Sequence, residues 1–292
     1  MFFTDLSLIW FAFVDHLLWS GRILRAGPRA VNVPVNWDNW ASVSRDSSSH
    51  AFVAPVWLVI FWTFYFGVIA GLWMLRRAGL LRPLDGVLRL LAFLHNIILS
   101  VWSAGMFLGA GRTVLAIARN RGGVSQTFCS SSFGEFPQNI YYWLYMFYLS
   151  KPVEFMDTFL LAARGKPLTL LHVWHHASVV LETWSWLRFG LTFSIYGMLF
   201  NAGIHAVMYL YFAYTSMQWR FPGKRMITLM QIMQFVASFV LTVPYLILLW
   251  KRPEGCMGLP GLAVSTFCNG SYLLLFVRFY RRTYKVRTKP KD

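Results

Sequence analysis

The sequence has little charge and very little acid. Of its 292 residues 13% are charged, and Asp and Glu number 11 against 27 Lys and Arg. Three cysteines are too few for a small fold held together by disulfides, and no internal repeat or low-complexity tract is visible. The chain is 57% hydrophobic and 18% aromatic. Such a composition leaves little sequence for a soluble domain and is typical of a membrane protein.

Apolar runs of about 20 residues, long enough to cross a bilayer, recur along the chain. They lie at about 52–75, 86–110, 139–163, 168–187, 191–214, 226–249 and 259–280. The sequence therefore predicts an all-α, multi-pass membrane protein with seven transmembrane helices over residues 51–280. Residues 1–50 are predicted to form an amphipathic interfacial helix and a polar loop, because Asp5, Asp15 and His16 interrupt their apolar run. Residues 281–292 are predicted to be a basic tail.

The distribution of Lys and Arg predicts the orientation of the chain. The segments on the side of the basic tail carry the larger share, which places the C-terminus in the cytosol and, after seven crossings, the N-terminus in the lumen. The net charge of +16 has two explanations: anchoring on anionic membrane lipid, or a basic mouth that attracts a polyphosphate ligand. Because the basic residues are spread over separate loops, nucleic acid is not an expected partner.

Four predicted helices carry polar clusters, which are costly in a membrane and often mark functional sites. In chain order the clusters are Lys151, Glu154, Asp157 and Thr158; His172, His175 and His176; Asn201, His205, Tyr209 and Tyr211; and Gln231 and Gln234. Each also has a structural explanation, as an ion pair or as hydrogen bonds that join helices. Since the third and fifth helices carry their clusters late and the fourth and sixth carry theirs early, all four are expected at similar depth. This agreement favours one shared site.

Clustered histidines allow two kinds of chemistry. Four of them, His172, His175, His176 and His205, can readily meet, whereas His95 on the second helix is expected to lie apart. Membrane desaturases and hydroxylases bind two irons with eight or more histidines, so four are too few for a site of that class. Four histidines would still be enough for a mononuclear metal site. The second kind is acyl transfer. Cys129 and Cys256 are expected in luminal loops, and Cys268 lies in the seventh predicted helix without a His neighbour in sequence. A covalent nucleophile in the shared site would therefore have to be a histidine.

The same four clusters resemble the sequence boxes of the ELO family of very-long-chain fatty acid elongases. "KPVEFMDT" resembles K-x-x-E-x-x-D-T, "HVWHH" resembles H-x-x-H-H, "NAGIHAVMYLYF" resembles N-x-x-x-H-x-x-M-Y-x-Y-Y, and "TLMQIMQ" resembles T-x-x-Q-x-x-Q. The boxes follow one another in the family's order. One departure is visible, since Phe212 stands where the family commonly has its last Tyr.

The resemblance implies an endoplasmic-reticulum 3-ketoacyl-CoA synthase. Such an enzyme condenses a long-chain acyl-CoA with malonyl-CoA and releases CO2 and CoA, using neither a metal nor another cofactor. It implies six helices around an acyl tunnel, together with partners of the elongation cycle: a ketoacyl reductase, a dehydratase and an enoyl reductase. A homo- or hetero-oligomer is compatible with it. The rival functions are an iron-dependent membrane oxidase and a seven-helix receptor or transporter.

The predicted roles follow from the boxes and from the chemistry. His175 is the expected acyl-accepting nucleophile, with Glu154 or Asp157 holding its tautomer, and Asn201 and His205 positioning the thioester carbonyl. His172 and His176 complete the catalytic set, and a single ternary step with general-base histidines is the alternative. The expected substrate-binding residues are Lys151, Thr158, Tyr209, Tyr211, Gln231 and Gln234, together with Arg220, Lys224 and Arg225 for the CoA phosphates.

The two loop cysteines are expected to pair. Cys129 follows the second predicted helix and Cys256 follows the sixth, so both fall on the luminal side. An oxidising compartment permits a disulfide there.

Overall fold

A computed structural model describes residues 52–120, 124–220 and 222–284, and every regular element in these ranges is helical. In chain order the elements are α3 (Val56–Arg77), the 3-10 turn η2 (Arg82–Leu84), α4 (Asp85–Asn120), α5 (Ser125–Phe128), α6 (Gln138–Ala163), α7 (Leu170–Phe189), α8 (Ser194–Ser216), α9 (Lys224–Lys251) and α10 (Leu259–Tyr284). The expected N-terminal interfacial helix and loop, and residues 285–292 of the expected tail, lie outside the described residues. Residues 281–284 continue α10.

The chain is a helical multi-pass membrane protein. In the described residues, α3, α4 with the preceding 3-10 turn, α8, α9 and α10 are long and apolar enough to cross a membrane. The other two long helices, α6 and α7, carry the Lys-Glu-Asp and histidine clusters, which lower their mean hydropathy. A polar face that points inward does not prevent a helix from crossing, so seven crossings remain a prediction.

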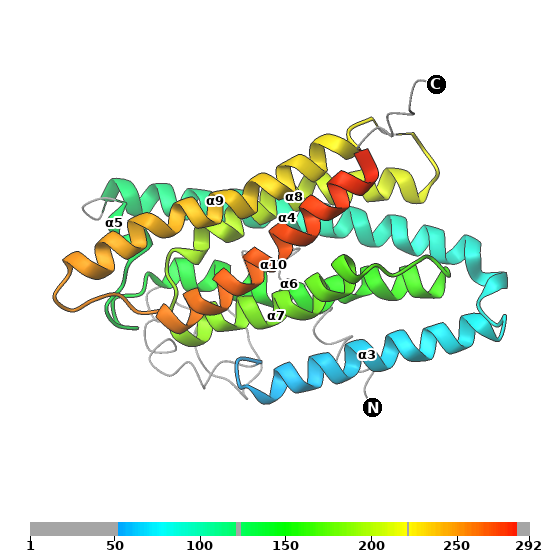
Figure 1. The fold of residues 1–292 in the computed structure, drawn as a ribbon, viewed down its shortest axis with the longest axis horizontal. Coiled ribbons are helices and arrows are strands. Elements are labelled where there is room, and N and C mark those ends of the chain that lie inside the picture. The colour runs from blue at the N-terminus through cyan, green and yellow to red at the C-terminus, as the bar shows by residue number, and fades with distance from the viewer. Residues whose placement is uncertain (1–51, 121–123, 221, 285–292) are drawn as a thin grey trace, which may run out of the picture.

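Six of the long helices form a closed ring. Neighbouring helices pack in the order α4, α8, α9, α10, α7 and α6, and α6 packs back against α4. The remaining long helix, α3, lies outside the ring against α6 and α7. In Figure 1 the helices run roughly along the long axis, and the end of α10 lies at the same end of the molecule as the α8–α9 connection. This is the six-helix arrangement that the family resemblance implied.

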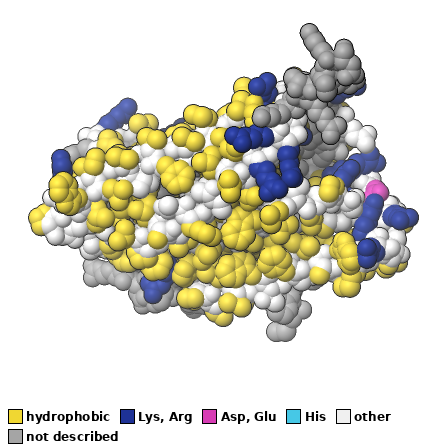
Figure 2. Space-filling view, viewed as in Figure 1, with side chains coloured by type: hydrophobic (Ala, Val, Ile, Leu, Met, Phe, Trp, Pro, Cys, Tyr) yellow, Lys and Arg dark blue, Asp and Glu magenta, His cyan; other side chains and the backbone are white. Residues whose placement is uncertain are grey.

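The outer surface is apolar in its middle and basic toward its ends. Large hydrophobic side chains such as Val59, Val240 and Leu274 are 60%, 63% and 71% exposed. Figure 2 shows hydrophobic side chains over most of the visible face, with Lys and Arg gathered toward the two ends. An apolar surface of this extent fits contact with lipid rather than with water.

The second predicted helix is longer than expected. Its apolar run was expected to end near residue 110, but α4 continues to Asn120. Arg112 and Arg119, which follow the predicted apolar run, therefore lie within a helix. A charged residue interrupts an apolar run, but Arg is a good helix former, and the helix continues past it.

A disulfide joins two loops at the end of the ring opposite the C-terminus of α10. Cys129, just after α5, is bonded to Cys256 in the α9–α10 connection, and their Cα atoms are 5.3 Å apart. The backbone amide of Met257 also donates to the carbonyl of Ser130 over 2.8 Å. This is the cysteine pair that the sequence analysis expected.

Candidate active site

A cavity of about 230 Å³ lies inside the helix ring, and all four polar clusters reach it. Its walls come from the later part of α6, the start of α7, the middle of α8, the start of α9 and the later part of α10. The predicted residues that line it are Asp157, His172, His175, His176, Asn201, His205, Tyr209, Tyr211, Lys224, Gln231 and Gln234. Residues that are far apart in the sequence thus share one chamber.

Local structure at the start of α7 sets the position of the first histidine. Thr169 is the N-cap of α7, and its hydroxyl accepts a hydrogen bond from the backbone amide of His172 over 3.2 Å. The His172 ring then lies 2.9 Å, from Nε2 to Oγ1, from Thr158. Thr158 is in turn 3.0 Å from the hydroxyl of Tyr65 on α3. Thr158, predicted to bind substrate, therefore lies behind His172 rather than on the cavity wall.

Asp157, whose side chain is partly buried, is the centre of a hydrogen-bond network. One carboxylate oxygen lies 3.0 Å from Nε2 of His95, and the other accepts from the hydroxyl of Tyr209 over 2.8 Å. The second oxygen is also 4.0 Å from Nε2 of His176. The prediction that His95 lies apart is wrong, because the contact of α4 with α6 brings this side chain to the carboxylate.

Glu154 forms a second network one turn earlier on α6. Its carboxylate accepts from Nζ of Lys151 over 2.7 Å and from the hydroxyl of Ser150 over 3.0 Å. The Lys151 ammonium also lies 3.7 Å from the centre of the Phe147 ring, a cation–π distance. The other Glu154 oxygen is 3.9 Å from Nδ1 of His205. Lys151 and Glu154 do not line the cavity but lie behind a histidine that does.

His175 does not have the carboxylate partner that was predicted for it. No hydrogen bond joins it to Glu154 or Asp157, and its ring instead lies 4.9 Å from the ring of Tyr272 and 5.5 Å from that of His176. Successive residues on an α-helix point about 100° apart, so His176 faces the carboxylate on α6 while His175 faces α10. His175 lines the cavity nevertheless.

Several buried polar atoms in the chamber lack a hydrogen-bond partner among the residues that the structure describes. These atoms are Nδ1 of His176, Oδ1 of Asn201 and Oε1 of Gln234, and all three side chains line the cavity. Buried polar groups in folded proteins are nearly always paired. These atoms can accept or donate hydrogen bonds to a ligand in the cavity that carries polar groups.

The comparisons with known proteins place the chain in a family. The family model described as "ELO: GNS1/SUR4 family" matches residues 49–292. The chain belongs to the ELO family. It is 32% identical to "Fatty acid elongase sre1" of Dictyostelium discoideum over 70% of this chain and 76% of that protein. It is also 32% identical to "Very long chain fatty acid elongase 6" of Homo sapiens, over 68% of this chain and 75% of that one.

One functional candidate lies outside the four ELO boxes. His95 is in none of them, and an isolated histidine in an apolar run gives no periodic signal that would group it with the others. His95 is only 9% exposed and lies within hydrogen-bond distance of Asp157, and we therefore include it in the candidate site.

The predicted CoA-binding cations of this ELO chain divide into two groups. Lys224 lines the cavity, whereas Arg220 and Arg225 do not. Arg225 donates from Nε to the hydroxyl of Tyr280 over 2.9 Å, which turns it toward α10. Glu182, a further buried carboxylate on α7, accepts a hydrogen bond from Asn269 over 2.9 Å and does not line the chamber.

The side chains of the described residues form no group of three or more His, Cys, Asp and Glu that could hold a metal ion. That the reaction needs no metal remains a prediction.

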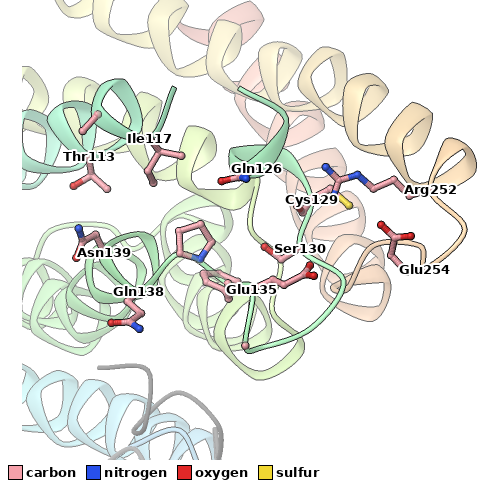
Figure 3. A pocket seen from close by; sticks show the side chains of 14 residues that line it. Thr113, Ile117, Gln126, Cys129, Ser130, Glu135, Gln138, Asn139, Arg252 and Glu254 are labelled. Atoms are coloured by element: carbon pink, nitrogen blue, oxygen red, sulfur yellow. Dashed lines mark hydrogen bonds between the residues drawn. The ribbon is translucent and has the colours of Figure 1, made fainter. Parts of the chain in front are cut away.

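A larger cavity lies at the opposite end of the ring, beside the disulfide. It measures about 960 Å³ and is lined by the later part of α4, by α5 and the loop that leads into the start of α6, and by residues just after α9. Figure 3 shows Glu135, Arg252 and Glu254 around it, with Cys129 between them. Glu135 accepts hydrogen bonds from the hydroxyl and the amide of Ser131, which lower the pKa of its carboxyl. No histidine reaches this cavity, so the candidate site is the smaller chamber.

Proposed function

We propose that this protein elongates long-chain fatty acids in the endoplasmic reticulum membrane by condensing an acyl-CoA with malonyl-CoA. The observation that carries the proposal is the chamber in which histidines from α7 and α8 meet unpaired polar atoms of α7, α8 and α9. Relatives named fatty acid elongases, which are 32% identical to this chain over 70% and 68% of its length, support it. With its C-terminus in the cytosol, the chamber would open toward the compartment that holds CoA esters.

The chemistry is proposed to run in two stages. His175 attacks the thioester carbonyl, the C–S bond breaks, and the imidazole proton passes to the CoA thiolate, so that an acyl-imidazole and free CoA result. Malonyl-CoA then enters and loses CO2, and its enolate attacks the acyl carbon. The C–N bond breaks, 3-oxoacyl-CoA leaves, and the imidazole regains a proton. The sequence of steps needs room for only one CoA ester at a time.

The other residues are assigned by their contacts. His205 and Asn201 face the chamber and would polarise the carbonyl and assist decarboxylation. Asp157 would hold the orientation of His176, and Glu154 that of His205, since these are the pairs at 4.0 and 3.9 Å. Tyr211, Gln231 and Gln234 would contact the substrate.

The reaction product sets the expected partners. A 3-oxoacyl-CoA must be reduced, dehydrated and reduced again before another round, so we propose a ketoacyl reductase, a dehydratase and an enoyl reductase as functional partners. The synthase itself would need no resident cofactor.

Purified protein incubated with saturated acyl-CoAs of increasing length and labelled malonyl-CoA tests the activity. Labelled 3-oxoacyl-CoA and an equal amount of CO2 are expected for at least one chain length. Absence of product for every acyl-CoA, from protein that remains monodisperse, would refute the proposed function.

Mass spectrometry of protein incubated with acyl-CoA alone tests the two-stage route. The wild type is expected to gain one acyl group on His175 and to release one equivalent of CoA. His175→Ala should gain none, whereas His205→Ala should still gain the acyl group on His175, although more slowly, and should also condense slowly. An active wild type with neither adduct nor released CoA would instead support the single ternary step.

The contribution of Lys224 to CoA binding has a matched control in its neighbour. Lys224→Glu is expected to raise the KM for both CoA esters, because this cation lines the chamber. Arg225→Glu makes the same charge change one residue on, at a side chain that does not line it. Equal KM values in the two variants would show that only the overall charge of the mouth matters.

A further inference from the structure

A separate basic cavity lies outside the helix ring, where α3 meets the α6–α7 connection. It measures about 650 Å³ and is lined by Arg76, Arg77, Arg82 and Lys166, with Trp73 beside them. It shares no lining residue with the histidine chamber. In Figure 1 the turn from α3 to α4 lies at one end of the molecule, and Figure 2 shows Lys and Arg gathered at that end.

One of the four cations holds the cavity together. The Arg76 guanidinium donates to the two carboxylate oxygens of Asp85 over 2.5 and 3.3 Å and to the carbonyl of Ala163 over 3.3 Å. These bonds connect the last turn of α3 to the start of α4 and the end of α6. The cavity therefore has a fixed wall, and the charge of Arg76 is already compensated.

The other three cations are not compensated. Arg77, Arg82 and Lys166 are exposed, and no carboxylate within residues 52–120, 124–220 and 222–284 lies at ion-pair distance from any of them. The Arg77 guanidinium is 4.0 Å from the centre of the Trp73 ring, which limits its freedom. Three uncompensated cations around a hollow match the charge and the acceptor oxygens of a phosphate group.

The surroundings of the cations are apolar. Trp73 lines the cavity and is 53% exposed, and Met74 and Leu80, which follow it in the chain at the end of α3 and in the turn after it, are 59% and 64% exposed. Since α3 lies outside the ring and exposed apolar side chains of this size fit contact with lipid, this side of the cavity is suited to hydrocarbon. A ligand that combines a phosphate with hydrocarbon chains satisfies both parts of the surface.

We propose that this cavity binds the phosphate headgroup of an anionic phospholipid, with the acyl chains lying along α3. Free CoA carries the same phosphate chemistry but has no hydrocarbon to cover Trp73 and Met74. The site does not depend on the proposed enzymatic function, since no residue of the histidine chamber takes part.

Native mass spectrometry of the full chain in detergent tests the proposal, with phosphatidylglycerol and phosphatidylcholine of identical acyl chains as probes. The variant R77Q/R82Q/K166Q removes the three uncompensated cations. The control R278Q/R281Q/R282Q removes three exposed arginines from α10, none of which lines the cavity. The wild type should bind phosphatidylglycerol in preference to phosphatidylcholine, and the cavity variant should lose affinity for phosphatidylglycerol by roughly 100-fold. The control should keep nearly the wild-type affinity.

Three results would overturn the proposal. Equal losses in the two triple variants would show a diffuse attraction to the whole basic end, equal binding of the two lipids would exclude recognition of charge, and displacement of the lipid by free CoA would assign the cavity to CoA. Circular dichroism and size-exclusion chromatography establish that the variants are folded. Should the triple variant fail to fold, Arg82→Gln and Lys166→Gln are each expected to weaken binding by roughly fivefold, and no change in either would count against the site.

Discussion

The ion pair of Lys151 and Glu154 should dominate the response of this fold to mutation. The two side chains are 1% and 2% exposed, and they lie one turn apart on α6. Lys151→Met keeps much of the side-chain volume but removes the ammonium. Glu154 would then keep one hydrogen bond, from Ser150, and its other oxygen already has no partner among the described residues.

The size of the effect follows from the burial of both groups. Breaking a buried ion pair at one partner leaves an uncompensated charge and costs about 3–5 kcal/mol, whereas replacing both partners by apolar residues is often close to neutral. We therefore expect Lys151→Met to lower the free energy of unfolding by about 3–5 kcal/mol. The double variant K151M/E154L should recover most of that stability. It should remain about 1 kcal/mol less stable than the wild type, because the hydrogen bond from Ser150 to Glu154 is lost.

Unfolding in mixed micelles with increasing sodium dodecyl sulfate, followed by circular dichroism, measures these differences. Lys166→Met is the matched control, since the same substitution at an exposed lysine should change stability by less than about 0.5 kcal/mol. If the single variant were no less stable than this control, or if the double variant were as unstable as the single one, the reasoning from burial would be refuted.

Three further changes probe other parts of the structure. His95→Leu removes the hydrogen bond to the Asp157 carboxylate and should lower kcat about 10- to 100-fold with little change in KM; an unchanged kcat would exclude His95 from the site. Cys129→Ser removes a disulfide between residues that are 127 positions apart, and it should lower the free energy of unfolding by about 2–5 kcal/mol. Its melting temperature in detergent should equal that of the reduced wild type. A difference between the two would show that the serine has another effect. Gly109→Ala places a Cβ against the indole of Trp143 and should destabilise by about 1–3 kcal/mol, whereas Gly105→Ala, which meets no atom within 4 Å, should not; equal melting temperatures would contradict the packing of α4 against α6.

Much of the architecture was available from the sequence because a membrane restricts the choice of structure. A segment in hydrocarbon must satisfy its own backbone hydrogen bonds, so an apolar run of sufficient length is a helix. The observed helices begin and end within a few residues of the predicted ones, except where α4 continues through Arg112. Polar residues spaced three and four apart mark the inward face of a helix. Their late position on α6 and α8 and early position on α7 and α9 predicted that the four clusters lie at similar depth.

The pairing of particular side chains depended on the tertiary structure. Spacing alone could not tell which histidine of "HVWHH" faces the carboxylates, since that depends on the rotation of α7 against α6, and the structure turns His176 rather than His175 toward Asp157. Nor could it assign His95, whose partner lies 62 residues away on another helix.

The basic residues also show which properties can be predicted from the sequence and which depend on the packing of the helices. Their distribution among the segments between the predicted helices predicted a basic end of the molecule, because it depends on the order of the helices and not on their packing. Which cation reaches the chamber depends on how α9 and α10 meet: Arg225 bonds to Tyr280, and Lys224, one residue earlier and about 100° away around the helix, lines the cavity. The sequence determines which residues are polar and on which helix they lie, and only the packing of the helices determines which of them touch.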